Sequence, residues 1–87
     1  MSDAPAVLIT GAAIRIGAVI AREFHARGFN VVVHYHSSAA AAEELVRELN
    51  AQRKDSACCL QASLLDADAV ARLASESVNC FGRLDVA

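Results

Sequence analysis

The sequence has 87 residues, of which 55% are hydrophobic, and a formal net charge of -2. This length allows one small globular unit, which buries a low fraction of its surface. Its seven arginines and one lysine are scattered along the chain, which argues against a nucleic-acid partner. No apolar run approaches the ~20 residues that span a bilayer, and the start "MSDAPAVLIT" lacks the features of a signal peptide. We therefore expect one cytoplasmic domain over residues 1–87 that has no membrane partner.

The three cysteines, Cys58, Cys59 and Cys80, are odd in number and form no C-x-x-C motif. This pattern favours buried thiols in a reducing cytoplasm over a metal site or a disulfide.

Short apolar runs alternate with longer amphipathic stretches along the whole chain. The runs predict strands over Ala6–Thr10, Asn30–His36 and Ser56–Gln61, and the start of a fourth strand over Arg83–Ala87. The stretches predict helices from Ile14 to Gly28, over Ser37–Lys54 with Ser38 as the N-cap, and over Asp66–Gly82. This alternation predicts right-handed crossovers and a parallel sheet, so we expect an α/β fold of the doubly wound, Rossmann type.

Helical spacing also predicts which side chains face the core. Ile16, Ile20 and Phe24 recur every four residues and predict the apolar face of the first helix. Ala42, Leu45 and Leu49 predict the inner face of the second helix. The acidic start of the third helix suits the positive end of its dipole.

The stretch "LITGAAIRIG", residues 8–17, joins the first strand to the first helix. In doubly wound folds, ligands bind at this edge of the sheet, and a helix start offers unpaired N–H groups to an anion. Gly11 allows a sharp exit from the strand, and Gly17 allows the helix to pack closely on the sheet. The glycine spacing is neither a P-loop nor the G-x-G-x-x-G form. Taken alone, these glycines are equally well explained as structural.

Three segments resemble the short-chain dehydrogenase/reductase family. "TGAAIRIG" is similar to its TGxxxGxG turn, and within the family it most resembles pteridine reductases, which carry an arginine at the middle glycine's position. "HYHSSAA" at residues 34–40 looks like the HYH-x-SA segment of the same subfamily, and "GRLDV" at residues 82–86 looks like the stretch before the family's NNA motif. The resemblance spans nearly the whole chain.

The resemblance implies a dinucleotide site that takes residues from all three predicted strand ends. The candidate cofactor-binding residues are Gly11, Arg15, Ile16, Gly17, His34, Tyr35, His36, Ser37, Ser38, Ser63 and Leu64. Arg15 would contact the cofactor phosphates and lie near a pteridine pocket, with charge-assisted hydrogen bonds. The alternative is a solvated arginine at a helix start.

The end of the second predicted strand bears on the choice between NADPH and NADH. NAD-selective proteins place Asp or Glu there, whereas this chain has no carboxylate before Glu43. The resemblance puts His34, His36 and Ser38 around the 2′-phosphate of NADPH, with Ser37 where some relatives have arginine. The alternative is a histidine-bearing strand end exposed to solvent.

The resemblance also implies an adenine contact after the third predicted strand. The family commonly has an aspartate where this chain has Ser63, so the Ser63 hydroxyl or the Leu64 backbone would serve. Asp66 is better explained as the cap of the third helix.

The family's catalytic tyrosine, lysine and serine or aspartate lie beyond the fourth strand. The only tyrosine here is Tyr35, without a Tyr-x3-Lys spacing. Family members run to roughly 250 residues as one domain. We therefore expect this chain to be a truncated reductase that corresponds to about the first third of a full-length member. Two functions stay open: NADPH-dependent hydride transfer to a pterin or folate-like substrate by a full-length, homo-oligomeric parent, and a non-catalytic dinucleotide-binding or interaction fragment. Within the enzyme class, a keto-acyl or sugar-alcohol reductase is the rival.

Overall fold

Strands and helices alternate in the computed structural model, which describes residues 4–13 and 15–86. The elements are β1 (Ala6–Ile9), α1 (Arg15–Ala26), β2 (Asn30–Tyr35), α2 (Ala39–Gln52), β3 (Ala57–Gln61) and α3 (Ala67–Phe81). The predicted order of these six elements is confirmed, with ends that differ by one or two residues. The predicted helix start at Ile14 lies outside the described residues.

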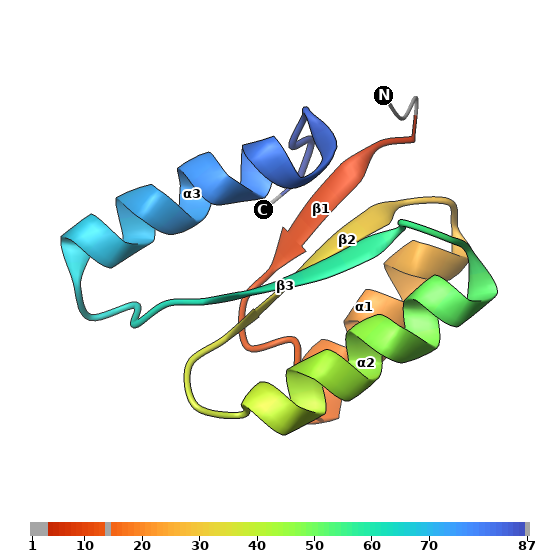
Figure 1. The fold of residues 1–87 in the computed structure, drawn as a ribbon, viewed down its shortest axis with the longest axis horizontal. Helices are drawn as coiled ribbons and strands as arrows, with labels where there is room; N and C mark the ends of the chain where they lie inside the picture. The colour runs from red at the N-terminus through yellow and green to blue at the C-terminus, as the bar shows by residue number, and fades with distance from the viewer. Residues whose placement is uncertain (1–3, 14, 87) are drawn as a thin grey trace.

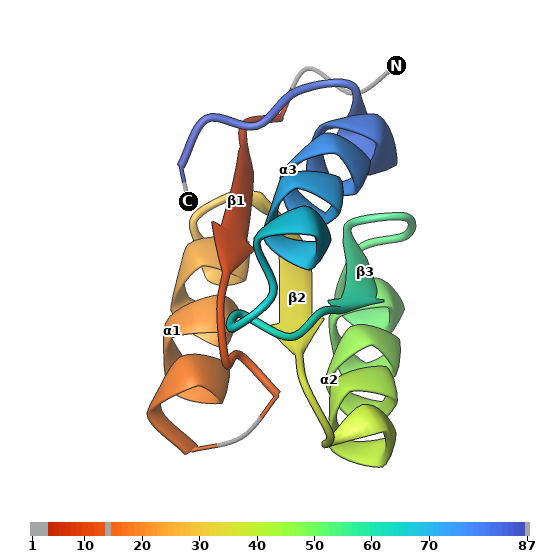
Figure 2. The same ribbon diagram turned by 90° about the vertical axis from the view of Figure 1, so that its left-hand side faces the viewer.

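The three strands form one parallel sheet in the order β1-β2-β3. Helices α1 and α2 cover one face of this sheet, and α3 covers the other (Figures 1 and 2). This division follows from right-handed crossovers, because β1, β2 and β3 advance in one direction across the sheet and the chain then returns towards β1. The fold is therefore of the Rossmann-like α/β class, with a parallel sheet between helices, as predicted.

The predicted fourth strand contributes a single bridge among the described residues. Val86 pairs with Val7 in parallel. The Leu8 N–H donates to the Val86 carbonyl at 2.8 Å, and the Val86 N–H donates to the Ala6 carbonyl at 3.2 Å. The chain thus returns to the free side of β1, where a fourth strand of this fold would lie, while Ala87 lies outside the described residues.

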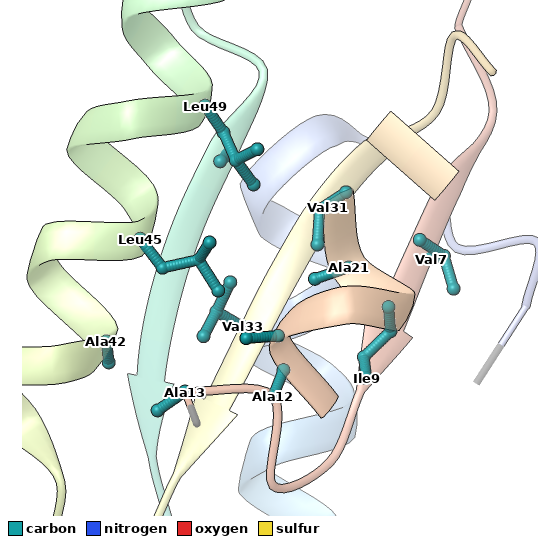
Figure 3. Close-up of a cluster of buried hydrophobic side chains, with 12 residues drawn as sticks. Val7, Ile9, Ala12, Ala13, Ala21, Val31, Val33, Ala42, Leu45 and Leu49 are labelled. Atoms are coloured by element: carbon teal, nitrogen blue, oxygen red, sulfur yellow. The ribbon is translucent and has the colours of Figure 1, made fainter. Parts of the chain in front are cut away.

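The larger core lies between the sheet and the helices α1 and α2. Val31 and Val33 of the central strand point towards Leu45 and Leu49 of α2 (Figure 3). The buried residues of α2 are Ala42, Leu45 and Leu49, so the predicted inner face of this helix is confirmed. The β-branched residues of a central parallel strand are covered on both faces, which explains their unbroken apolar run.

The predicted apolar face of α1 is wrong for Ile16 and Ile20, whereas Phe24 is half-buried and packs against the larger core. Ile16 is 75% exposed and Ile20 is 41% exposed, whereas the buried residues of α1 are Ala18, Ala21 and His25. The larger Ile20 and Phe24 instead line a groove beside β1.

The smaller core lies under α3, whose buried residues are Ala69, Leu73 and Ser77. The Asp66 carboxylate accepts from the backbone N–H groups of Asp68 at 2.9 Å and Ala69 at 3.3 Å. Gly82 ends the helix in the left-handed conformation, with φ of 76°. Both predicted caps are confirmed, and no helix within the described part of the chain is long and apolar enough to cross a membrane.

A polar cluster closes the amino-terminal edge of β2 and β3. His25 is 2% exposed, and its Nε2 lies 2.7 Å from the Ser56 hydroxyl. The Arg53 guanidinium donates to the carbonyls of His25 at 3.1 Å and Phe29 at 2.5 Å. Burial first, and then the nearby charge of Arg53, lower the pKa of His25. This cluster fixes the end of α1 to the segment between α2 and β3.

Candidate functional site

The predicted site residues gather at the carboxyl-terminal edge of the sheet. The loops that follow β1, β2 and β3 all leave this edge, and α1 and α2 begin there (Figure 2). The eleven predicted residues fall into three groups. Gly11, Arg15, Ile16 and Gly17 follow β1. His34 and Tyr35 end β2, and His36, Ser37 and Ser38 follow it, while Ser63 and Leu64 follow β3. The topology therefore brings the three predicted groups to one edge.

The first turn packs directly against the start of α1. A Cβ atom at Gly17 would lie 2.2 Å from the Gly11 carbonyl oxygen and 2.8 Å from the Ala12 Cα. Gly11 itself has φ of +62°, in the left-handed region that favours glycine. The sharp turn predicted at Gly11 is confirmed by this geometry. Gly17 also serves close packing, but its near neighbours belong to the first turn and not to the sheet.

Arg15 also occupies a conformation that suits glycine. Its φ is +56°, and the left-handed region costs a non-glycine residue roughly 1–2 kcal/mol. The side chain is exposed and stands in the first turn of α1, next to the exposed Ile16. A guanidinium in this place adds a positive charge to the positive end of the helix dipole, which suits an anionic ligand.

His34 connects the three strand ends. The Gly11 N–H donates to His34 Nδ1 at 3.1 Å, so Nε2 carries the ring proton and donates to the Ala62 carbonyl at 2.8 Å. The Ala12 N–H donates to the His34 carbonyl at 3.1 Å. His34 is only 2% exposed, so it is not a solvated strand end. Both ring nitrogens are used to hold the first turn against the end of β3.

The residues after His34 are more accessible. Tyr35 is half-buried and packs against the larger core, and its carbonyl accepts from the Ala62 N–H at 3.1 Å. His36 and Ser37 are exposed. The Gln61 side chain donates to the His36 carbonyl at 3.1 Å, which ties this loop to β3.

Ser38 occupies the predicted N-cap position of α2, but its hydroxyl makes no cap hydrogen bond to the described first turn of the helix. Its carbonyl accepts from the Ala42 N–H at 3.0 Å. The first turn of α2 contains no acidic residue. The start of α2 therefore presents backbone N–H groups and a hydroxyl without an opposing carboxylate, which suits an anion.

The loop after β3 carries Ser63 and Leu64. The Ser63 hydroxyl accepts from the Leu65 N–H at 3.3 Å, so it stabilises its own turn. Leu64 is 50% exposed. The Asp66 carboxylate is engaged by the backbone N–H groups at the start of α3, which it caps.

The cysteines are less buried than predicted. All three are free and half-buried, and the thiol of Cys58 lies 2.7 Å from the Cys80 sulfur. The sequence separates these residues by a loop and a helix, so no local pattern shows that they meet. Within residues 4–13 and 15–86, no group of three or more His, Cys, Asp or Glu side chains is arranged to hold a metal ion.

Comparison with known proteins places this architecture among related sequences. A family described as short chain dehydrogenase matches residues 5–87. The chain is 52% identical over 61 residues to pteridine reductase 1 of Leishmania tarentolae, covering 70% of this chain and 21% of that protein. It is 43% identical over 84 residues to versicolorin reductase 1 of Aspergillus parasiticus, covering 97% and 32% of the two chains. It is 41% identical over 86 residues to the 3-oxoacyl-(acyl-carrier-protein) reductase FabG of Staphylococcus aureus, covering 99% and 35%.

The matched region is thus a fraction of each relative. The chain spans between 21% and 35% of the length of these three proteins.

Proposed function

The chain belongs to the short-chain dehydrogenase family, and on this premise we propose that residues 1–87 form an incomplete dinucleotide-binding domain of an NADPH-dependent reductase. The reductase would act on pteridine or folate-type substrates. Nicotinamide-dependent oxidoreductases transfer a hydride between the cofactor and the substrate, and the protein binds and orients both. The same proposal places the protein in the cytoplasm, the reducing compartment that suits unbridged thiols.

The observation that carries the proposal is the contact between the Gly11 turn and Gly17 at the start of α1. The missing Cβ at Gly17 lets the start of α1 lie directly against the Gly11 turn, and a pyrophosphate at this edge would meet the positive end of the helix dipole. Arg15, held in the same turn, would add a charge-assisted hydrogen bond to a phosphate oxygen. His34 would act as a positioning residue, because its two ring nitrogens already bind Gly11 and Ala62.

The loop after β2 supports NADPH over NADH. His36 and Ser37 are exposed, and Ser38 stands at the start of α2 with its hydroxyl uncommitted to a cap. These groups can donate hydrogen bonds to a 2′-phosphate. A carboxylate in this loop would repel that phosphate, and the loop contains none before Glu43.

Two of the relatives suggest different substrates. The 52% identity to a pteridine reductase, together with the arginine at the middle glycine's position, supports a pterin or folate-like ring. The match to a 3-oxoacyl-(acyl-carrier-protein) reductase is less identical but extends over 99% of this chain. A keto-acyl substrate is therefore the second candidate. A sugar-alcohol substrate and a non-catalytic dinucleotide-binding fragment are weaker alternatives.

Titration of the protein with NADPH and NADH tests the cofactor part of the proposal. We expect tighter binding of NADPH than of NADH, and equal or weaker binding of NADPH would contradict this part of the proposal.

A parallel assay of the whole reductase with biopterin, folate and a 3-oxoacyl thioester tests the substrate class. Reduction of the thioester without reduction of either pterin-type compound would favour the keto-acyl reductase. The reading frame after Ala87 would show whether a Tyr-x3-Lys motif follows.

A further inference from the structure

Two cysteines meet between β3 and α3. Residues along β3 alternate between the two faces of the sheet, so Cys58 packs into the smaller core beside Cys80 of α3, whereas Cys59 packs into the larger core. Cys80 stands in the last turn of α3 and Cys58 near the start of β3, and the two elements lie side by side there (Figure 2). The fold therefore brings together two thiols that lie 22 residues apart in the chain.

The two sulfur atoms are already close to bonding distance. The Cys58 thiol donates to Cys80 Sγ, and the two atoms are 2.7 Å apart. A disulfide bond is ~2.03–2.05 Å long, whereas even two non-bonded carbon atoms, which are smaller than sulfur, pack best at ~3.5–4.0 Å. Closing the remaining gap needs a shift of well under an ångström. Both residues are half-buried rather than fully enclosed, so a small reagent can reach the pair.

We propose that Cys58 and Cys80 form an oxidisable dithiol, which closes to an intramolecular disulfide on reaction with a low-molecular-weight disulfide. The proposal is independent of the cofactor and substrate discussed above. It assigns a covalent modification site to the face of the sheet opposite α1 and α2.

The reaction proceeds by two successive exchanges. The thiolate of Cys80 attacks one sulfur of the small disulfide, so that a mixed disulfide forms on Cys80 and one small thiol leaves. The sulfur of Cys58 then attacks Cys80 Sγ, and the second small thiol leaves as the Cys58–Cys80 bond forms. The chain loses two electrons and two protons, and the small disulfide gains both to become two thiols.

Burial supports this order of attack. Burial first, and then the hydrogen bond with Cys80, raise the pKa of the Cys58 thiol. Since the thiolate is the attacking form, Cys58 is poorly suited to attack first. Once Cys80 carries the mixed disulfide, Cys58 faces an electrophilic sulfur in direct contact, and proximity compensates for its low thiolate fraction.

The disulfide would reinforce the more thinly packed side of the sheet. The side chains of α3 that are buried, Ala69, Leu73 and Ser77, include one large apolar residue. A covalent link from Cys80 to Cys58 would hold the last turn of α3 on the sheet and restrict the unfolded chain.

Thiol mapping of the whole protein tests the proposal. The reduced protein is incubated in glutathione buffers of increasing oxidised fraction, quenched in acid, alkylated, digested with trypsin and analysed by mass spectrometry. Trypsin leaves Cys58 and Cys59 together in the peptide Asp55–Arg72 and Cys80 in Leu73–Arg83. The matched control is therefore Cys59→Ser, which removes the neighbouring thiol from the opposite face of the same strand.

We expect the wild-type protein and Cys59→Ser to lose two alkylatable thiols each and to yield the two peptides joined. Cys58→Ser and Cys80→Ser should instead carry glutathione on the remaining partner, with faster modification of Cys80 than of Cys58. Full alkylation of the wild-type thiols at high oxidised glutathione would overturn the proposal. Loss of the joined peptides in Cys59→Ser, or links that form only between chains, would overturn it as well. Faster modification of Cys58 would overturn the order of attack.

Discussion

At the scale of single residues, Arg15 combines an unfavourable backbone with an exposed charge. Its φ of +56° places it in the left-handed region, and strain of this kind persists at ligand sites when function requires the side chain. We therefore predict opposite effects of Arg15→Gly on stability and on binding. The free protein should become more stable by about 1 kcal/mol, because glycine removes the left-handed penalty.

The affinity of Arg15→Gly for NADPH should fall. A hydrogen bond to a charged group contributes roughly 1.5–3 kcal/mol, which corresponds to a dissociation constant about 10- to 150-fold weaker. Urea denaturation and cofactor titration at matched salt measure the two effects. Arg15→Asn is the matched control, since asparagine tolerates the left-handed region without the charge. Unchanged affinity in both variants would make Arg15 only a solvated residue at a helix start.

His36 tests how the loop after β2 selects the cofactor. Replacing the exposed His36 with aspartate puts a carboxylate where the 2′-phosphate of NADPH would bind. We predict that His36→Asp erases or reverses the preference for NADPH over NADH. His36→Asn, which adds no charge, should retain most of the preference. Isothermal titration of both cofactors measures the ratio, and identical ratios in all three proteins would show that this loop does not contact the phosphate.

At the scale of elements, the approach of α1 to the first turn depends on Gly17. A Cβ atom there would meet backbone atoms of Gly11 and Ala12, which cannot rotate away. We predict that Gly17→Ala destabilises the fold by about 1–3 kcal/mol, as overpacking does, and abolishes most NADPH binding. Gly11→Ala meets open space and carries only its left-handed φ, so it should cost about 1–2 kcal/mol. Chemical denaturation compares the two variants. A smaller loss of unfolding free energy in Gly17→Ala than in Gly11→Ala would show that the first turn shifts easily to accommodate the added Cβ atom.

The polar cluster that joins α1 to the start of β3 predicts a pH dependence. In the unfolded chain His25 takes up a proton near pH ~6.5, whereas burial and Arg53 lower its pKa in the folded state and Glu48 only partly opposes them. The unfolded state therefore binds more protons below about pH 6.5, and stability is lost as the pH falls from there. His25→Gln should flatten the decline in the unfolding midpoint between pH ~7.5 and ~5.5. The exposed His36→Gln is the control, and parallel declines in all three proteins would contradict this assignment.

Element boundaries were predictable where a local interaction sets them. The cap at Asp66 and the end at Gly82 depend on hydrogen bonds and backbone angles within a few residues. The inner face of α2 was predictable because its leucines pack against apolar residues of the sheet, Val31 and Val33 of β2. The face of α1 was not, because Ala18 and Ala21 are buried while Ile16 and Ile20 are exposed, the reverse of the usual rule that large apolar residues lie inside. The double hydrogen bonding of His34 depends on the ends of two other strands, which no local pattern contains.

At the scale of the whole molecule, the order of elements determined the topology. Right-handed crossovers leave few arrangements for β-α-β-α-β-α, and the observed sheet is one of them. The contact between Cys58 and Cys80 follows from this topology. Predicting it from the sequence would have required knowing both the face of β3 on which Cys58 lies and the length of α3. Under the proposed function, the same topology separates binding from chemistry, because the residues proposed to bind the cofactor gather at one edge of this sheet.

This separation gives the last prediction, that the 87-residue chain does not reduce pterins. The resemblance implies a tyrosine proton donor four residues before a lysine, and Tyr35 and Lys54 are the only residues of these types. Tyr35 packs against the larger core, and Lys54 follows α2 at the opposite edge of the sheet. With biopterin or folate present, NADPH absorbance should fall no faster with the purified chain than in buffer alone. Turnover that survives repurification and disappears in Tyr35→Phe would show that this chain carries its own proton donor.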